Sequence, residues 1–396
     1  DPKRFIEACK TVRKIAHARI SACGATLESE APPLPDRKAC SMACTAKNCA
    51  MQIHRTSEGE VVALHCCSGS YMSLKPREIA LKAALAANKY GLNHWEVVNG
   101  FRGRQGWLTK CGKADIFSSE DFGIAFEPES ADFWIELLRR ISYREGIGNT
   151  LAEGWVRGTD ILGKGKEYLP HVAHGYQSHW NGHLYGAPKF PYWLVSALMW
   201  IMDSRDPFVH GYAQEITRWW GEGKGPLDME KIKVISKRVH GSEKAVDPES
   251  SYYWKAQPAI WHQNRDAVKD SLLVCDQIFP IFFSLKSEDG YGDTGAEGKL
   301  FSSATGMELN EIELDRIGER IFNLERMIMV REGRTRQLDE TNIEYFKQPD
   351  YEGIRLDEEK FERLITEFYA LRGWDEITGL PKKEKLKELE LGFTLV

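Results

Sequence analysis

The cysteines are the residues of this 396-residue chain whose type and spacing most directly suggest chemistry. Cys40, Cys44 and Cys49 fall within ten residues, and Cys275 stands far along the chain. Three thiols in a compact loop and one distant thiol suit a four-iron cluster, because each iron binds one thiolate. The spacing therefore predicts a [4Fe-4S] cluster.

Two other interpretations of these cysteines stay open. A structural zinc site usually brings two closely spaced pairs, whereas the grouping here is three plus one. Thiols with no ligand role are also common, because free cysteine packs well in protein cores. The odd total of nine cysteines argues against a complete disulfide framework. We therefore expect a reducing compartment and a cytoplasmic protein.

Helices are the elements expected to position these residues. Apolar spacing of three and four, with capping signals at the ends, predicts helices over residues 76–88, 310–331 and 357–371. The middle helix is expected to bury one apolar stripe, formed by Ile312, Ile317, Ile321, Leu324 and Ile328. Strand signals are few, such as residues 60–64, and residues 286–298 are predicted to be a surface loop. The pattern favours a mainly α fold.

Charge and hydropathy exclude two classes of protein. The 53 basic and 58 acidic residues give a net charge of −5 and are interleaved, which argues against a nucleic-acid-binding protein. No stretch approaches the roughly 18 apolar residues of a membrane-spanning helix. We expect no nucleic-acid partner and no membrane-spanning segment.

Several segments resemble one known family, in the family's own order. Asp270-Ser-Leu-Leu-Val-Cys275 resembles the pterin-binding signature of the tungsten-containing aldehyde:ferredoxin oxidoreductases. Residues 148–155 are similar to the family's Gly-x-x-Leu-Ala-Glu-Gly segment, and residues 320–336 to its Asn-Leu-Glu-Arg and Arg-Glu-Gly segments. Residues 371–386 resemble its closing signature. The likeness runs from about residue 36 to the C-terminus.

The resemblance implies two helical domains that hold a tungsten or molybdenum bis-pyranopterin beside a [4Fe-4S] cluster. Residues 1–165 would carry three cluster cysteines and one pterin motif, and residues 166–396 the second pterin motif and the fourth cysteine. The family's N-terminal β-rich domain, on which the pterins lie, has no counterpart in residues 1–35. We therefore expect a missing domain or subunit, and expect that this chain alone does not retain the cofactor.

The resemblance also assigns individual residues. The cluster ligands would be Cys40, Cys44, Cys49 and Cys275, although the first three are more widely spaced than is usual in the family. One pterin would be held by Asp270, Leu272, Leu273 and Val274. The second would be held by Asn88, Gly91, Leu92 and Asn93, where both acidic positions of the family signature are uncharged asparagines.

One departure bears on the reaction. Aldehyde-oxidising members carry a Pro-Glu-Tyr-Glu-Thr segment near the metal, whereas this chain reads His65-Cys66-Cys67 in the equivalent region. Tungsten and molybdenum accept thiolate readily, so Cys66 is a candidate metal ligand, chosen arbitrarily over Cys67. The alternative is two small buried residues. With a cysteine as tungsten ligand, this chain resembles the active-site subunit of the class II benzoyl-CoA reductases.

That likeness implies reduction of the ring of benzoyl-CoA, or of a related aryl-CoA, to a cyclic dienoyl-CoA with low-potential electrons. His210 is the preferred proton donor and His65 the second, because histidine titrates near neutral pH. Trp180, Trp193 and Trp200 are candidates for an aromatic pocket wall, with an ordinary core role as the alternative.

Three functions stay open from the sequence. The first is the aryl-CoA reductase, a hetero-oligomer with an iron–sulfur electron-transfer subunit or ferredoxin as partner. The second is oxidation of an aldehyde to a carboxylic acid. The third is a non-catalytic iron–sulfur electron-transfer subunit that has lost the pterin.

Overall fold

The computed structural model describes most of the chain. The described residues are 2–15, 52–64, 77–92, 107–169, 190–204, 216, 219–220, 223, 225–274, 279–341, 347, 349–350 and 352–395. They form two compact units, and α1 (Pro2–Ile15) belongs to the larger unit with the elements from α8 onward. The predicted domain boundary at residues 165 and 166 stays a prediction, because residues 170–189 lie outside the described part.

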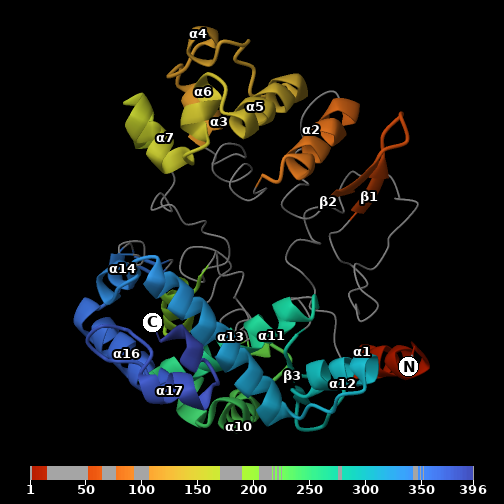
Figure 1. The fold of residues 1–396 in the computed structure, drawn as a ribbon, viewed down its shortest axis with the longest axis vertical. Coiled ribbons are helices and arrows are strands. Elements are labelled where there is room, and N and C mark those ends of the chain that lie inside the picture. The colour runs from red at the N-terminus through yellow and green to blue at the C-terminus, as the bar shows by residue number, and fades with distance from the viewer. Residues whose placement is uncertain are drawn as a thin grey trace. The chain divides into compact units, whose positions relative to one another are not determined.

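The fold is mainly α, as predicted (Figure 1). The smaller unit contains β1 (Gln52–Arg55), β2 (Val61–Leu64), α2 (Arg77–Lys89), α3 (Trp107–Lys113), α4 (Ser119–Phe122), α5 (Ala131–Tyr143), α6 (Ile147–Leu151) and α7 (Trp155–Leu162). The larger unit adds α8 (Trp193–Met202), α10 (Met229–His240), α11 (Ala256–Ser271), β3 (Ile281–Phe283), β4 (Tyr291–Asp293), α12 (Ala296–Thr305), α13 (Glu311–Arg331), α14 (Arg336–Thr341), α16 (Glu358–Arg372) and α17 (Lys383–Glu388). Each strand pair is an antiparallel hairpin.

The smaller unit is built around α5. This helix buries Phe133, Trp134, Leu137, Leu138 and Ile141 on one face. α2 and α6 pack against it. A Cβ at Gly148 would lie 2.2 Å from the carbonyl oxygen of Arg140, so α6 can approach the end of α5 only with glycine at this position.

The larger unit is built around α11, which packs against α8, α10, α13 and α16. α13 lies closest, because a Cβ at Gly318 would fall 2.0 Å from the carbonyl oxygen of Asn264. Capping follows the sequence: Asn310 and Glu313 form a capping box at the start of α13. Asp357 caps the start of α16, and Gly373, with φ 70°, ends it. The three predicted helices are confirmed.

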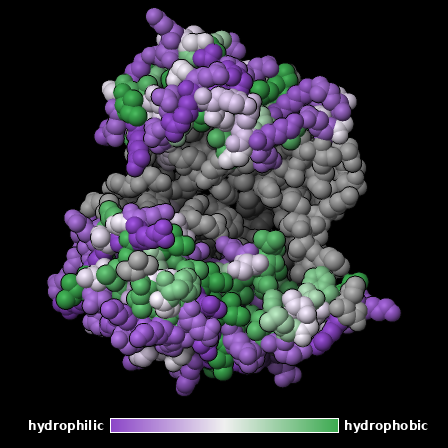
Figure 2. All heavy atoms as spheres, in the orientation of Figure 1, coloured by the Kyte–Doolittle hydropathy of each residue, from purple (hydrophilic) through white to green (hydrophobic). Residues whose placement is uncertain are grey.

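Two details of the sequence prediction are wrong. The buried face of α13 consists of Leu314, Gly318, Phe322, Asn323 and Arg326, whereas Ile312 is 80% exposed and Ile328 is 51% exposed. The close contact at Gly318 and a polar network described below turn that face toward α11. Hydrophobic side chains therefore reach the visible surface of the larger unit (Figure 2).

The second error concerns the predicted surface loop at residues 286–298. This segment contains β4 and the first turn of α12, and Glu297 within it has no exposed surface. No helix in the described part of the chain is long and apolar enough to cross a membrane.

Candidate functional site

The segment from Asp270 to Val274 forms the C-terminal end of α11. The N–H of Val274 donates to the carbonyl of Lys269 (3.1 Å), and the N–H of Leu273 donates to the carbonyl of Asp270 (3.2 Å). This pair of bonds is a Schellman motif, which ends a helix on a residue in the left-handed conformation. Leu273 is that residue, with φ 54°. Val274 then packs against a core cluster that includes Phe279.

The segment from Asn88 to Leu92 ends α2 in the same way. The N–H of Leu92 donates to the carbonyl of Ala87 (3.0 Å), and the N–H of Gly91 donates to the carbonyl of Asn88 (3.1 Å). Gly91 is the left-handed residue, with φ 66°. Gly91 lies just past the helix predicted over residues 76–88, and a glycine at this position is a signal for the end of a helix.

The two helix ends correspond residue by residue. Asp270 and Asn88 occupy one position, and Leu273 and Gly91 occupy the left-handed position. α2 belongs to the smaller unit and α11 to the larger unit, so each unit supplies one of the two motifs. The two segments that resemble pterin signatures therefore share one local structure.

Leu273 combines two unfavourable features. Its side chain is 85% exposed, the largest fraction among the exposed large hydrophobic residues that the structure describes. The left-handed conformation of a residue with a Cβ costs about 1–2 kcal/mol. Other non-glycine residues with the same cap geometry carry polar side chains, namely Asp115, Arg144 and Glu390. Backbone strain of this kind concentrates at functional sites, so Leu273 is a candidate contact residue.

Asp270 is exposed in the last turn of α11. A carboxylate is disfavoured there, because the C-terminal end of a helix carries partial negative charge. An ionised carboxylate only accepts hydrogen bonds, so the position suits a ligand that presents N–H donors. The amino-pyrimidinone ring of a pterin presents such donors, and these residues therefore fit the group. Asn88 is also exposed at the end of α2, with both donor and acceptor atoms.

The remaining predicted site residues lie outside the described part of the chain. They are Cys40, Cys44, Cys49, Cys66, Cys275, His65, His210 and Asn93. Among the residues that are described, no group of three or more His, Cys, Asp or Glu side chains is placed to hold a metal ion. The described cysteines, Cys9 and Cys111, are buried and form no disulfide with each other, and burial raises the pKa of the Cys111 thiol to about 12.

Comparison with known proteins identifies the family. A family model described as "Aldehyde ferredoxin oxidoreductase, domains 2 & 3" matches residues 21–391. The chain belongs to the aldehyde ferredoxin oxidoreductase family. This confirms the resemblance inferred from the sequence, including its restriction to the second and third domains.

Curated relatives in this family include the tungsten-containing aldehyde ferredoxin oxidoreductases of Pyrococcus horikoshii and Thermococcus kodakarensis. The first is 26% identical over 367 residues, which is 89% of this chain and 52% of the relative. The second is 26% identical over 259 residues, which is 64% of this chain and 35% of the relative. The chain thus spans about half the length, or less, of these relatives.

A solved structure shares the fold. The active site complex BamBC of benzoyl coenzyme A reductase, in complex with 1,5 dienoyl-CoA, matches with a TM-score of 0.51 and 19% sequence identity. The match covers 88% of this chain and 52% of that one.

A buried polar network in the larger unit includes Arg326 and Arg334, which lie in the segment that resembles the family's Asn-Leu-Glu-Arg and Arg-Glu-Gly sequences. Arg326 on α13 forms two bonds to the carboxylate of Asp339, at 2.9 and 2.7 Å. Arg334 and Tyr369 bind the same carboxylate at 2.5 Å each. Arg334 also donates to the carbonyl of Ile201 (2.6 Å), near the end of α8. The network thereby fixes the C-terminal end of α8, which precedes His210 in the sequence.

The two tryptophans of α8 that were candidates for an aromatic pocket wall are buried in the core. Trp193 has no exposed surface and donates to the carboxylate of Asp350 (2.9 Å), and Trp200 is 3% exposed. Both therefore belong to the core, which is the alternative considered for them. Trp180 lies outside the described residues.

Asp203, which follows α8, was not predicted as a site residue. Its carboxylate accepts a bond from Gln263 on α11 (2.7 Å), and Gln263 in turn accepts a bond from the buried Arg372 (2.8 Å). Burial raises the pKa of Asp203 well above its usual range, and the nearby Asp266 and Glu325 add to this effect. No local pattern in the sequence predicts this environment, because the neighbouring side chains come from α11, α13 and α16.

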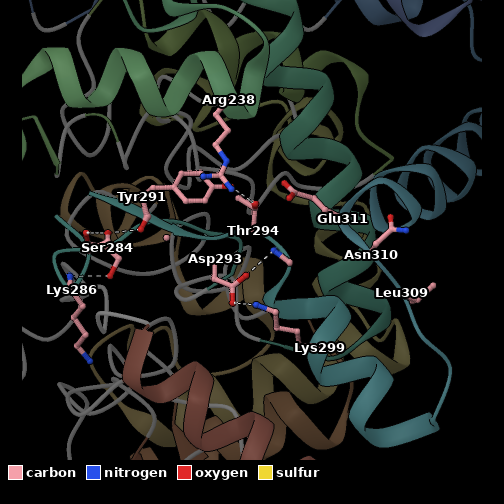
Figure 3. A pocket seen from close by; sticks show the side chains of 13 residues that line it. Arg238, Ser284, Lys286, Tyr291, Asp293, Thr294, Lys299, Leu309, Asn310 and Glu311 are labelled. Atoms are coloured by element: carbon pink, nitrogen blue, oxygen red, sulfur yellow. Dashed lines mark hydrogen bonds and ion pairs between the residues drawn. The ribbon is translucent and has the colours of Figure 1, made fainter. Parts of the chain in front are cut away.

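A polar pocket lies beside β4 and the starts of α12 and α13 (Figure 3). Its volume is about 630 Å³. Arg238 stacks over the ring of Tyr291, 3.6 Å from its centroid, and Asp293 pairs with Lys299 at 2.6 Å. Glu311 lines the same pocket. Cationic and acidic side chains alternate around it.

Proposed function

We propose that this chain is the cofactor-binding part of a tungsten or molybdenum pterin oxidoreductase that reduces the ring of benzoyl-CoA or a related aryl-CoA. The observation that carries the proposal is that both segments resembling pterin signatures, Asn88–Leu92 and Asp270–Val274, expose a polar side chain at a Schellman helix end, a cap that several other helices of the chain share. A bis-pyranopterin has two alike halves, so two alike protein segments are the expected binding arrangement. Family membership supports the same cofactor.

When bound, the metal pterin and its neighbouring cluster supply the two-electron chemistry. The chain's own residues bind and orient the group. Asp270 accepts hydrogen bonds from the N–H donors of one pterin, and the exposed side chain of Leu273 packs against it. Val274 anchors this segment to the core. Asn88 and the backbone around Gly91 serve the second pterin in the same way.

The iron–sulfur part of the proposal rests on the cysteines. Cys40, Cys44, Cys49 and Cys275 ligate a [4Fe-4S] cluster, which receives electrons from an iron–sulfur subunit or a ferredoxin. The enzyme is then a hetero-oligomer in the cytoplasm, where thiolates stay reduced.

Two observations favour aryl-CoA as the substrate. His65-Cys66-Cys67 replaces the acidic segment of aldehyde-oxidising members, and Cys66 is the proposed additional metal ligand. The fold is also that of a solved benzoyl coenzyme A reductase complex. His210 donates the proton in this scheme, with His65 as the second candidate.

Aldehyde oxidation is the second candidate function. The names of the curated relatives favour it, since each is a tungsten-containing aldehyde ferredoxin oxidoreductase. A subunit that only transfers electrons is the third, and it would contain iron and sulfide without tungsten or molybdenum.

The test is a two-substrate assay on the full-length, cofactor-loaded enzyme. Benzoyl-CoA with a low-potential electron donor is expected to yield a cyclic dienoyl-CoA, and the Cys66→Ala variant is expected to lose this activity. Turnover of benzaldehyde to benzoate with no reduction of benzoyl-CoA would replace the first candidate by the second. An unchanged tungsten absorption edge in Cys66→Ala would refute the ligand assignment.

A further inference from the structure

α1 and α12 lie side by side in the larger unit and share one core cluster (Figure 1). Cys9 of α1 belongs to the same buried hydrophobic cluster as Ala296 and Leu300 of α12. Phe5 and Ala8, on the same side of α1, also pack against this cluster. One face of α1 is therefore fixed to the larger unit.

The residue before Cys275 packs against the same core cluster. Val274, at the end of the α11 cap, contacts it together with the residues of α1 and α12. Cys275 is next in the sequence and is the proposed iron–sulfur ligand from the larger unit. An electron carrier has to approach an iron–sulfur cluster closely, so we examined the surface that α1 adds over this core.

α1 is strongly basic. Five of its 14 residues are lysine or arginine and one, Glu7, is acidic, whereas the whole chain has a net charge of −5. Lys3 and Lys10 are exposed, and they are seven residues apart, which places them on the same side of the helix. This side points away from the face that carries Cys9.

The acidic groups beside α1 do not cancel its charge. Lys10 pairs with Glu7 (3.1 Å), and Arg4 pairs with Glu308, which follows α12 in the sequence (3.0 Å). Both pairs are exposed, so they are weak and are screened by salt. These two acidic groups face the five basic residues of one helix, so an excess of positive charge remains.

Exposed apolar side chains accompany the basic residues. Ile6 of α1 is 41% exposed, and Met307, the residue before Glu308, is 62% exposed. The ion pair between Arg4 and Glu308 joins the two segments that carry them. Transient protein interfaces, including those of electron-transfer partners, are small and surround an apolar contact with a charged rim. The surface of α1 offers both.

We propose that the exposed face of α1, with Lys3, Ile6 and Lys10, is the docking surface for the iron–sulfur electron carrier, and that this carrier presents an acidic surface to it. The proposal rests on the proposed function, since it locates the partner that supplies the electrons. Each encounter passes one electron from the carrier, which is oxidised. Two encounters supply the two electrons that reduction of the aryl ring consumes together with two protons.

The charge of the whole chain explains why a basic helix would select the docking site. An acidic carrier is repelled on average by a chain with a net charge of −5. A local basic face attracts it, and opposite charges on two partners raise the rate of association more than the final affinity. Docking at α1 should therefore be fast at low salt and slow at high salt.

The experiment uses the full-length, cofactor-loaded enzyme and the double variant Lys3→Glu/Lys10→Glu. The matched control is Lys383→Glu/Lys387→Glu, which makes the same change of charge at two exposed lysines of α17, a helix that packs in a different core cluster. The probe is an acidic two-cluster ferredoxin. Calorimetry measures its affinity for the enzyme at low and high salt, without substrate.

Two rates of reduction complete the experiment. In the first, the reduced ferredoxin is the electron donor. In the second, the donor is photoreduced 5-deazariboflavin, a small uncharged molecule that needs no docking surface. Comparison of the two donors separates docking of the carrier from the redox properties of the enzyme.

We expect the double variant of α1 to bind ferredoxin more weakly at low salt and to be reduced by it about 10-fold more slowly or less, the low end of what charge steering contributes. The difference from wild type should shrink at high salt, because salt screens exposed charges. Reduction by 5-deazariboflavin should be unchanged. The α17 control should behave as wild type with both donors.

Unchanged affinity and rate with ferredoxin in the α1 variant would overturn the proposal, and so would an equal loss in the α17 control. Loss of assembly of the α1 variant with the rest of the enzyme would also overturn it, because the face would then belong to an internal interface. Failure of wild-type enzyme to turn over either benzoyl-CoA or an aldehyde would instead overturn the proposed function. The affinity measurement needs no turnover, so the two failures are distinguishable.

Discussion

At residue 273 the chain places a leucine in a backbone conformation that Gly91, its counterpart at the end of α2, adopts without steric cost. The side chain gains nothing from burial, because it is 85% exposed. A residue retained under both disadvantages is best explained by a contact with a group that binds there. Asp270 places a carboxylate at the C-terminal end of the same helix, where the partial negative charge of the helix disfavours it. Its position also indicates a contact with a bound group.

Replacing Leu273 tests its contribution to stability and its contribution to cofactor binding separately. Leu273→Gly should raise the free energy of unfolding by about 0.5–1 kcal/mol, because relief of left-handed strain exceeds the added entropy of glycine in the unfolded chain. The same variant should retain less pterin, measured by fluorescence after oxidative release from the full-length enzyme.

The matched control is Glu390→Gly, at another left-handed helix end, where φ is 59°. It should show a similar gain in stability and full pterin content. Equal pterin content in both variants would refute the contact assigned to Leu273.

The ionisation of Glu297 should appear in the pH dependence of stability. Burial raises its pKa to about 7 in the folded protein, against an ordinary value of 4.5. Between these values the unfolded chain releases its proton and the folded chain keeps it, so this group lowers stability as pH rises, by up to about 3 kcal/mol. Glutamine does not ionise.

The melting temperature of Glu297→Gln relative to wild type should therefore increase between pH 5 and pH 8. If the melting temperatures of the two proteins differed by the same amount at pH 5 and at pH 8, Glu297 would not titrate in this range.

Among the elements, α13, α14 and α16 are joined through one carboxylate. Asp339 accepts bonds from Arg326, Arg334 and Tyr369, and both Asp339 and Arg326 are fully buried. Arg334 links this network to the end of α8 through the carbonyl of Ile201.

Asp339→Ala should lower the free energy of unfolding by about 3–5 kcal/mol, since it leaves Arg326 buried without its counter-ion. Denaturant unfolding measures this change. Arg363→Ala, which removes an exposed ion pair with Glu359 on the surface of α16, is the control and should change stability by less than about 0.5 kcal/mol. Similar effects of the two substitutions would contradict a structural role of the network.

The sequence predicted these helices well where local signals decide them. The capping residues Asn310, Asp357 and Gly373 set the ends of α13 and α16, and local capping chemistry is visible in a sequence. The buried face of α16 contains Phe361, Leu364, Ile365 and Phe368, which recur at the spacing of an amphipathic helix. Amphipathic spacing therefore sufficed for this helix.

Prediction from the sequence failed where tertiary contacts determine which residues are buried. On α13, the close approach at Gly318 and the buried charge of Arg326 select a face that hydrophobicity alone does not mark. The polar stretch that holds β4 gave no sign that Glu297 would be buried. At the site, the resemblance supplied the two pterin segments, whereas the neighbourhood of Asp203 depends on contacts between elements distant in sequence. The left-handed conformation of Leu273 comes from local cap bonds, but a leucine does not signal it in a sequence.

For the whole molecule, each compact unit contributes one of the two equivalent helix ends, α2 from the smaller and α11 from the larger. The chain spans about half the length of the Pyrococcus horikoshii relative.

The most direct test of the central claim is the metal and pterin content of the full-length, assembled enzyme. We predict tungsten or molybdenum with two pterins per metal atom, together with the iron and sulfide of a [4Fe-4S] cluster. Iron and sulfide without tungsten, molybdenum or pterin would contradict the claim, and would leave the two helix ends without their proposed ligand.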